Sequence, residues 1–135
     1  MELIFVIGRV IFAFLFARSG LQHLERREAM AGFAKAKGAP VPSFTVPLTG
    51  VMLLVGSVLI ALGLWADLGA LLVAAFLLPT AFIMHAYWKI DDPQESSMDS
   101  VHFYKDISLL GAALVILFLY TQFSDVPASL TDGLF

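Results

Sequence analysis

Three ionisable side chains that could exchange protons lie in the second half of the sequence. His85 ends an apolar run, and His102 and Asp106 stand four residues apart at the start of the next one. Residues four apart share one face of a helix, and an imidazole changes charge near neutral pH. This pattern predicts a polar site whose side chains donate hydrogen bonds to a ligand and exchange protons with it.

Further polar and aromatic side chains are expected at the same depth, near one end of the apolar runs. We call this depth the polar level. An ionised Asp106 in hydrocarbon is costly unless it is paired, and Arg18 is the expected counter-charge at matching depth. His23, at the end of the first apolar run, belongs to the same level. The predicted ligand-binding set is His85, His102, Asp106, Arg18, His23, Tyr87, Trp88 and Tyr104, with no catalytic residue and no metal ligand assigned.

Long apolar blocks must position these residues. The chain has 135 residues, of which 59% are hydrophobic and 14% charged, with a mean hydropathy of +0.87. A soluble domain of this size could not bury that excess, so the blocks predict membrane spans. We expect an all-α integral membrane four-helix bundle with antiparallel up-down topology, forming a single transmembrane domain over 1–135. Its spans are expected at 3–24, 45–64, 68–88 and 100–121, with an interfacial basic linker at 25–42.

Several residues interrupt or end these blocks. Pro47 falls in the first turn of the second predicted span, where a missing N–H is harmless. Pro79 lies inside the third span and frees the carbonyl of Ala75, so a kink is expected. Arg9 must snorkel to the nearer headgroups, find a carboxylate or face a wet cavity, and snorkelling is the simplest of these. The tail, 122–135, is expected to extend or fray at the surface.

Charge is distributed unevenly between the two predicted sides of the membrane. An even number of spans places both termini on one side and the two longer loops on the other. The positive-inside rule then predicts cytoplasmic loops and non-cytoplasmic termini in the inner (plasma) membrane. The basic residues of the loops that carry this prediction are Arg26, Arg27, Lys35, Lys37 and Lys89.

Three interpretations of the polar level remain open. The first is an aromatic and polar belt that fixes helix register. The second is a pocket for an amphipathic redox molecule such as a quinone. The third is a metal or haem site built on the histidines. No HxxxH-type spacing supports the third. The chain lacks cysteine, a phosphate-binding glycine loop and hydrolase motifs, so self-contained hydrolytic or nucleotide chemistry is not expected. No basic patch interleaved with aromatics indicates nucleic acid.

Several short motifs, in their order and spacing, resemble the DoxX family of small four-helix membrane proteins. They extend over about residues 5 to 120 and comprise Gly8-Arg9-Val10, Ser19-Gly20-Leu21-Gln22-His23-Leu24, Lys37-Gly38-Ala39-Pro40-Val41-Pro42, His85-Ala86-Tyr87-Trp88, Asp92-Pro93, and His102-Phe103-Tyr104-Lys105-Asp106 followed by Leu109-Leu110-Gly111.

The resemblance implies a four-helix bundle and, because some relatives are subunits of thiosulfate:quinone oxidoreductase, a subunit or accessory of a quinone-linked membrane redox system. Two positions depart from the family pattern, which commonly has Lys at His23 and Asn at Asp106. The expected partners are the lipid bilayer, a quinone or similar amphipathic molecule, and other subunits or a second copy. The alternatives are a non-enzymatic scaffold and a small carrier of lipid-like molecules along the kink at Pro79.

Overall fold

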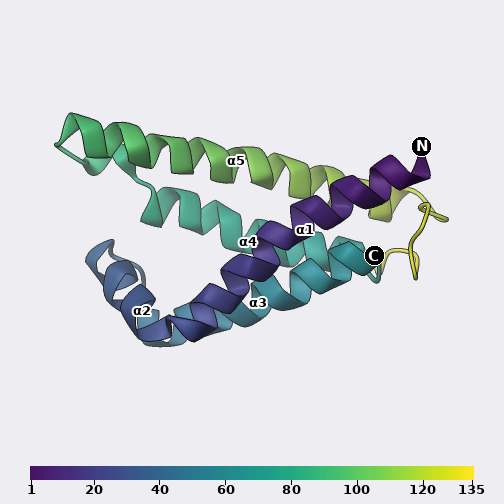
Figure 1. The fold of residues 1–135 in the computed structure, drawn as a ribbon, viewed down its shortest axis with the longest axis horizontal. Helices are drawn as coiled ribbons and strands as arrows, with labels where there is room; N and C mark the ends of the chain where they lie inside the picture. The colour runs from purple at the N-terminus through teal and green to yellow at the C-terminus, as the bar shows by residue number, and fades with distance from the viewer.

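The computed structural model describes all 135 residues and contains helices but no strand. Four long helices account for most of the chain (Figure 1), and each is long and apolar enough to cross a bilayer, the third together with the short helix that follows it. The predicted all-α architecture with four membrane helices is therefore confirmed. The elements are α1 (Glu2–Glu25), α2 (Arg27–Ala36), α3 (Pro42–Leu62), α4 (Ala66–Met84), the short 3₁₀ helix η1 (Tyr87–Lys89) and α5 (Pro93–Gln122).

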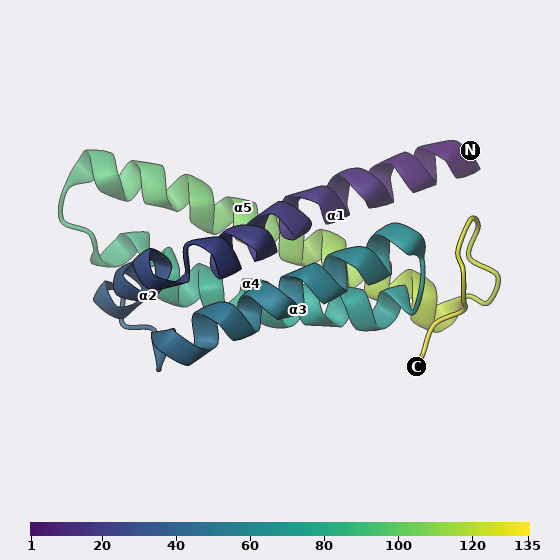
Figure 2. The same ribbon diagram turned by 60° about the horizontal axis from the view of Figure 1, so that its bottom comes forward.

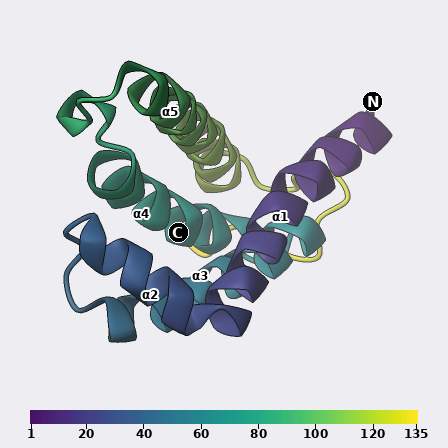
Figure 3. The ribbon, with the colours of Figure 1, turned by 60° about the vertical axis from the view of Figure 1, so that its left-hand side comes forward.

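The long helices run back and forth between two ends of the molecule, as expected for an up-down bundle (Figure 2). We call the end that holds α2 and residues 85–92 the loop end, and the end that holds both chain termini the terminal end. α1 packs on α3, α3 on α4, and α4 on α5. The outer helices α1 and α5 diverge (Figure 3), so the four helices form an open layer rather than a closed ring.

Glycines allow the inner helices to approach closely. A Cβ on Gly20 of α1 would lie 2.7 Å from the carbonyl oxygen of Gly50 in α3, and one on Gly69 of α4 would lie 2.8 Å from that of Gly56 in α3. Small residues at such crossings let membrane helices pack backbone to backbone. The contacts of α3 with both neighbours therefore depend on these four positions.

Three helix boundaries differ from the expectation, and one of them is the end of α4, at Met84 instead of residue 88. α3 begins at Pro42, so Pro47 lies inside the helix and not in its first turn. α5 begins at Pro93, seven residues before the expected start at 100, because Asp92 caps it by accepting a hydrogen bond from the Glu95 N–H at 2.8 Å. A helix of 30 residues is about 45 Å long and exceeds the roughly 30 Å of hydrocarbon. The first turns of α5 therefore extend beyond the apolar layer.

The C-terminal tail folds back onto the terminal end, so the expectation that it extends or frays is wrong. The Gly63 carbonyl accepts hydrogen bonds from the Leu130 and Thr131 N–H groups. The buried carboxylate of Asp67, in the first turn of α4, accepts from the N–H groups of Leu134 and Phe135. These hydrogen bonds hold the tail in place, because at a largely apolar surface its backbone groups would otherwise have no partner.

Arg9 is part of this terminal contact and does not snorkel to lipid headgroups. Its side chain is 5% exposed and donates hydrogen bonds to the Tyr120 hydroxyl at 2.6 Å, the Ser129 hydroxyl at 3.0 Å and the Ala128 carbonyl at 2.7 Å. A guanidinium buried among helices is tolerated when such acceptors surround it. Arg9 thus joins α1 to α5 and to the tail, two elements that α1 barely touches otherwise.

We predict that Arg9→Met lowers the free energy of unfolding in detergent by about 2–3 kcal/mol, because three hydrogen bonds to a charged group are lost. Arg18→Met is the matched control on the same helix. Arg18 is exposed and makes no ion pair or side-chain hydrogen bond within the protein, so its replacement should change stability by less than about 0.5 kcal/mol. Equal losses for the two variants in reversible detergent unfolding would contradict the assigned role of Arg9.

Candidate functional site

A cavity of about 460 Å³ lies at the loop end, between the diverging outer helices. All five α-helices contribute to its wall, and apolar side chains make up the larger part of it. Its volume falls within the range of natural small-molecule sites, about 300–1,000 Å³. The polar side chains of the wall are Ser19, His23, Thr45, Thr49, Thr80, His85, Lys105 and Asp106.

The local sequence explains why space remains here. α2 packs on α3 and contributes Met30, Phe33 and Ala34 to the wall, so this short helix covers the cavity on one side. Pro79, inside α4, also lines the cavity, and its ring replaces the N–H that would bond to the carbonyl of Ala75. The cavity is thus an apolar space between helices with a few polar groups in its wall.

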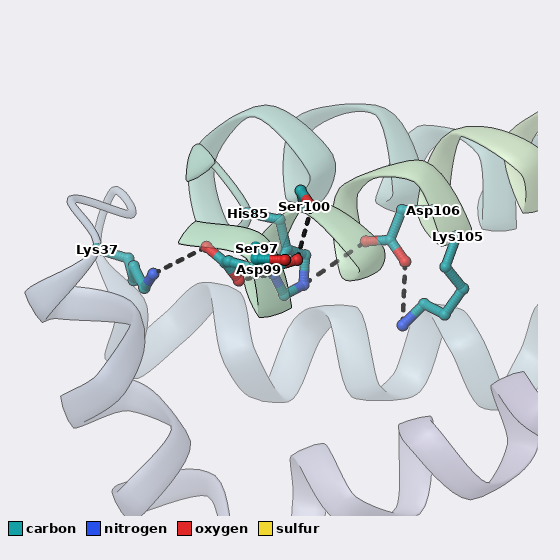
Figure 4. Close-up of polar contacts among 7 residues, drawn as sticks. All are labelled: Lys37, His85, Ser97, Asp99, Ser100, Lys105 and Asp106. Atoms are coloured by element: carbon teal, nitrogen blue, oxygen red, sulfur yellow. Dashed lines mark hydrogen bonds and ion pairs between the residues drawn. The ribbon is translucent and has the colours of Figure 1, made fainter. Parts of the chain in front are cut away.

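A chain of charged side chains crosses the wall at the loop end (Figure 4). Lys37 Nζ lies 3.2 Å from Asp99 Oδ2, and Asp99 Oδ1 lies 2.8 Å from His85 Nδ1. On the other side of the imidazole, His85 Nε2 lies 3.8 Å from Asp106 Oδ2, while Asp106 Oδ1 lies 3.3 Å from Lys105 Nζ. The network therefore runs from the linker after α2, across the start of α5, to the carboxylate that lines the cavity.

The hydrogen bonds of His85 determine where its proton sits. A carboxylate only accepts, so Nδ1 donates to Asp99. A neutral ring in this tautomer directs the lone pair of Nε2 toward Asp106, and the 3.8 Å between Nε2 and Oδ2 is longer than a hydrogen bond. Lys105 beside the carboxylate balances its charge. The arrangement can hold a hydrogen-bond donor and an exchangeable proton at the cavity wall.

The structure brings together only part of the predicted set. His23, His85 and Asp106 line the same cavity. His102 is exposed and lies outside the lining; its ring stacks on that of His85, with centroids 5.1 Å apart and an interplanar angle of 23°. It therefore supports the position of the His85 ring.

The predicted aromatic residues form a separate cluster on the outer side of α4, η1 and α5. Tyr87 packs edge-on against Trp88, and its hydroxyl lies 3.2 Å from that of Tyr104. Phe82 and Phe103 complete the cluster. Exposed tryptophan and tyrosine at the end of a membrane helix are typical of an interfacial belt, and none of these rings lines the cavity.

The predicted pair of Arg18 and Asp106 is wrong. Asp106 is buried and contacts His85 and Lys105, whereas Arg18 is exposed on α1. Depth alone suggested the pair, but α1 and α5 are not packed against each other, so matching depth does not bring the two side chains together.

Sequence reasoning missed Lys37 and Asp99. Asp99 was expected to stand at the start of the fourth span rather than inside a helix. A signal was present, because Asp92-Pro93 followed by Glu95 is typical of a helix start. A helix beginning there places Asp99 seven residues before Asp106, on the same face. The contact with Lys37 has no comparable signal, since it depends on where α2 packs.

The four long apolar helices define a small multi-pass α-helical membrane protein. The DoxX family model matches residues 4–86, more than half of the chain, and the protein belongs to the DoxX family. It is similar to the inner membrane protein YphA of Escherichia coli (strain K12), with 26% identity over 111 residues that cover 82% of this chain and 79% of that protein. No solved structure matches the chain. The protein is thus an inner-membrane, multi-pass member of this family.

We predict that Lys37 and Asp99 are energetically coupled. A double-mutant cycle with Lys37→Gln and Asp99→Asn, measured by unfolding in detergent, should give a coupling free energy of about 0.5–1 kcal/mol, since both groups are partly exposed. The control cycle combines Lys35→Gln with Asp99→Asn. Lys35 is exposed on α2 and makes no ion pair. Coupling of Lys35 to Asp99 as large as that of Lys37 would contradict a specific contact.

Proposed function

We propose that this protein binds an amphipathic molecule of the quinone type in the cavity at the loop end, as a subunit or accessory of a quinone-linked redox system of the inner membrane. One observation carries the proposal: a cavity of about 460 Å³ with an apolar lining has a polar group of three side chains in its wall, His85, Lys105 and Asp106. An apolar pocket with a few convergent polar groups is the usual form of a ligand site.

The chemistry of the wall suits a quinone head group. Its carbonyl oxygens only accept hydrogen bonds, and a protonated His85 or Asp106, together with Lys105, supplies donors. The apolar walls from α1, α2 and α4 accommodate the hydrocarbon tail. A quinone takes up two electrons and two protons when it is reduced, and we assign the electron donor to another subunit of the system.

The residues of the network have different roles in this proposal. His85 and Asp106 are the proton-exchanging groups at the cavity, while Lys105, 3.3 Å from Asp106, balances the charge of that carboxylate. Asp99 is a positioning residue: it accepts from Nδ1 of His85 and so directs Nε2 toward Asp106. The partly exposed Lys37 and Asp99 connect His85 to the linker after α2, and we assign to them the route by which protons reach His85.

We further propose that the loop end faces the cytoplasm. Its connections carry exposed basic residues, whereas the basic residue at the terminal end, Arg9, is buried within the protein. Short loops with an excess of Lys and Arg stay on the cytoplasmic side. The cavity then opens near the cytoplasmic surface.

The first test is quinone binding to the purified protein in mild detergent. We expect quinone or quinol in an organic extract, and a rise in thermal stability on adding decylubiquinone or its hydroquinone form. His85→Leu should weaken binding at least about tenfold, which corresponds to about 1.4 kcal/mol, because a donor at the cavity is lost.

The matched control for this test is His102→Leu, which should change affinity less than about threefold, since His102 lies outside the lining. A quinone-free extract together with no thermal shift would contradict the proposal and favour a scaffold. Transfer of the ligand between vesicles by the purified protein would favour a carrier.

The second test is topology. The chain has no cysteine, so single-cysteine variants report one position each. Ser124→Cys, in the exposed tail, should react with a membrane-impermeant maleimide in spheroplasts, whereas Ala29→Cys, exposed on α2, should react only after permeabilisation. The opposite labelling pattern would place the cavity near the periplasm and contradict the proposed orientation.

A further inference from the structure

A second polar group lines the cavity on the side of α1, away from the network of Figure 4. His23 is only 8% exposed. Its Nδ1 lies 3.2 Å from the Val46 carbonyl oxygen and 3.0 Å from the Thr49 hydroxyl oxygen, both on α3. The edge contact with the Phe76 ring, at 5.6 Å between centroids and 70° between planes, also holds the imidazole in place.

These contacts determine the tautomer of His23. The Thr49 hydroxyl donates its hydrogen to a backbone carbonyl, that of Thr45 at 2.8 Å or of Val46 at 2.9 Å, so its oxygen accepts from the imidazole. The Val46 carbonyl also only accepts. Nδ1 therefore carries the hydrogen in either case.

The other nitrogen of the ring is consequently an acceptor. No acidic side chain lies within ion-pair distance of His23 to stabilise an imidazolium at this buried position. Nε2 of the neutral ring carries a lone pair and has no hydrogen-bond partner within the protein, although its residue lines the cavity. This acceptor is not fully enclosed by the protein, so a ligand in the cavity that donates to it gains a hydrogen bond to an already oriented lone pair.

We propose that His23 Nε2 accepts a hydrogen bond from a ring hydroxyl of the ligand, and that His23 thereby selects hydroxyaromatic ligands over those that present only acceptor oxygens. This inference rests on the proposed function and specifies it. The cavity then has a donor side at His85 and Lys105 and an acceptor side at His23. A quinol, or another alkylated phenol, satisfies both sides, whereas an oxygen without hydrogen would face the lone pair of Nε2. A site built around a buried hydrogen bond discriminates against analogues that lack the group.

The test compares two probes, decylhydroquinone and its dimethyl ether, under reducing conditions. Wild-type protein should bind the hydroquinone at least about tenfold more tightly than the ether. His23→Leu should lower this ratio about tenfold, because no acceptor remains. His23→Gln should keep the ratio within about threefold of wild type, since the amide oxygen of glutamine reaches the position of Nε2.

The ratio is measured on a single protein preparation, so a general loss of affinity in a variant cancels. His23→Met provides a second variant without the acceptor should His23→Leu fail to fold, and it should behave in the same way. An unchanged ratio in the folded apolar variant, or a ratio in His23→Gln as low as in His23→Leu, would overturn the role of Nε2. Failure of both probes to bind wild-type protein would instead contradict the proposed function itself.

Discussion

The structure depends on one constraint: a charged or polar group among apolar helices must have a partner within the protein. The buried Arg9 has three acceptors from α5 and the tail, and the buried Asp67 accepts from two backbone N–H groups of the tail, while Arg9 Nε and Asp67 Oδ1 alone have no partner. Asp106 meets the constraint with His85 and Lys105. In hydrocarbon no water replaces a missing partner. These few residues therefore determine which segments can lie together at each end of the molecule.

The polar groups at the two ends of the molecule find their partners in different ways. At the terminal end the tail supplies its own backbone and hydroxyl groups, so Arg9 and Asp67 are enclosed and the outer helices are joined. At the loop end α1 and α5 diverge, and the polar groups of α4 and α5 border a cavity that α2 partly covers. At the terminal end the paired polar groups are enclosed, whereas at the loop end His85 and Asp106 lie beside an apolar space. This difference is the basis of the proposed ligand site.

Close contacts between small residues hold the inner helices together. Gly20 against Gly50 and Gly56 against Gly69 bring α3 near to α1 and α4. Of the long helices, α5 packs extensively only on α4, so the layer remains open between its first and last helices. Side chains from both sides then face one cavity: His23 from α1, and His85 and Asp106 from the α4 and α5 side. Belonging to the DoxX family specifies a small helical membrane protein, while these particular side chains specify what the cavity can recognise.

The sequence by itself determined the four apolar helices, the approximate positions of their ends and the polar level that includes His23, His85 and Asp106. It could do so because hydrophobic length and local spacing are properties of neighbouring residues. It did not determine the partners of Asp106, the burial of Arg9, the docking of the tail or the contact of Lys37 with Asp99. Those depend on which helices pack side by side, and on the depth and rotation of each helix. Residues far apart in the chain meet only when packing decides these quantities, and for that reason equal depth wrongly suggested a pair between Arg18 and Asp106.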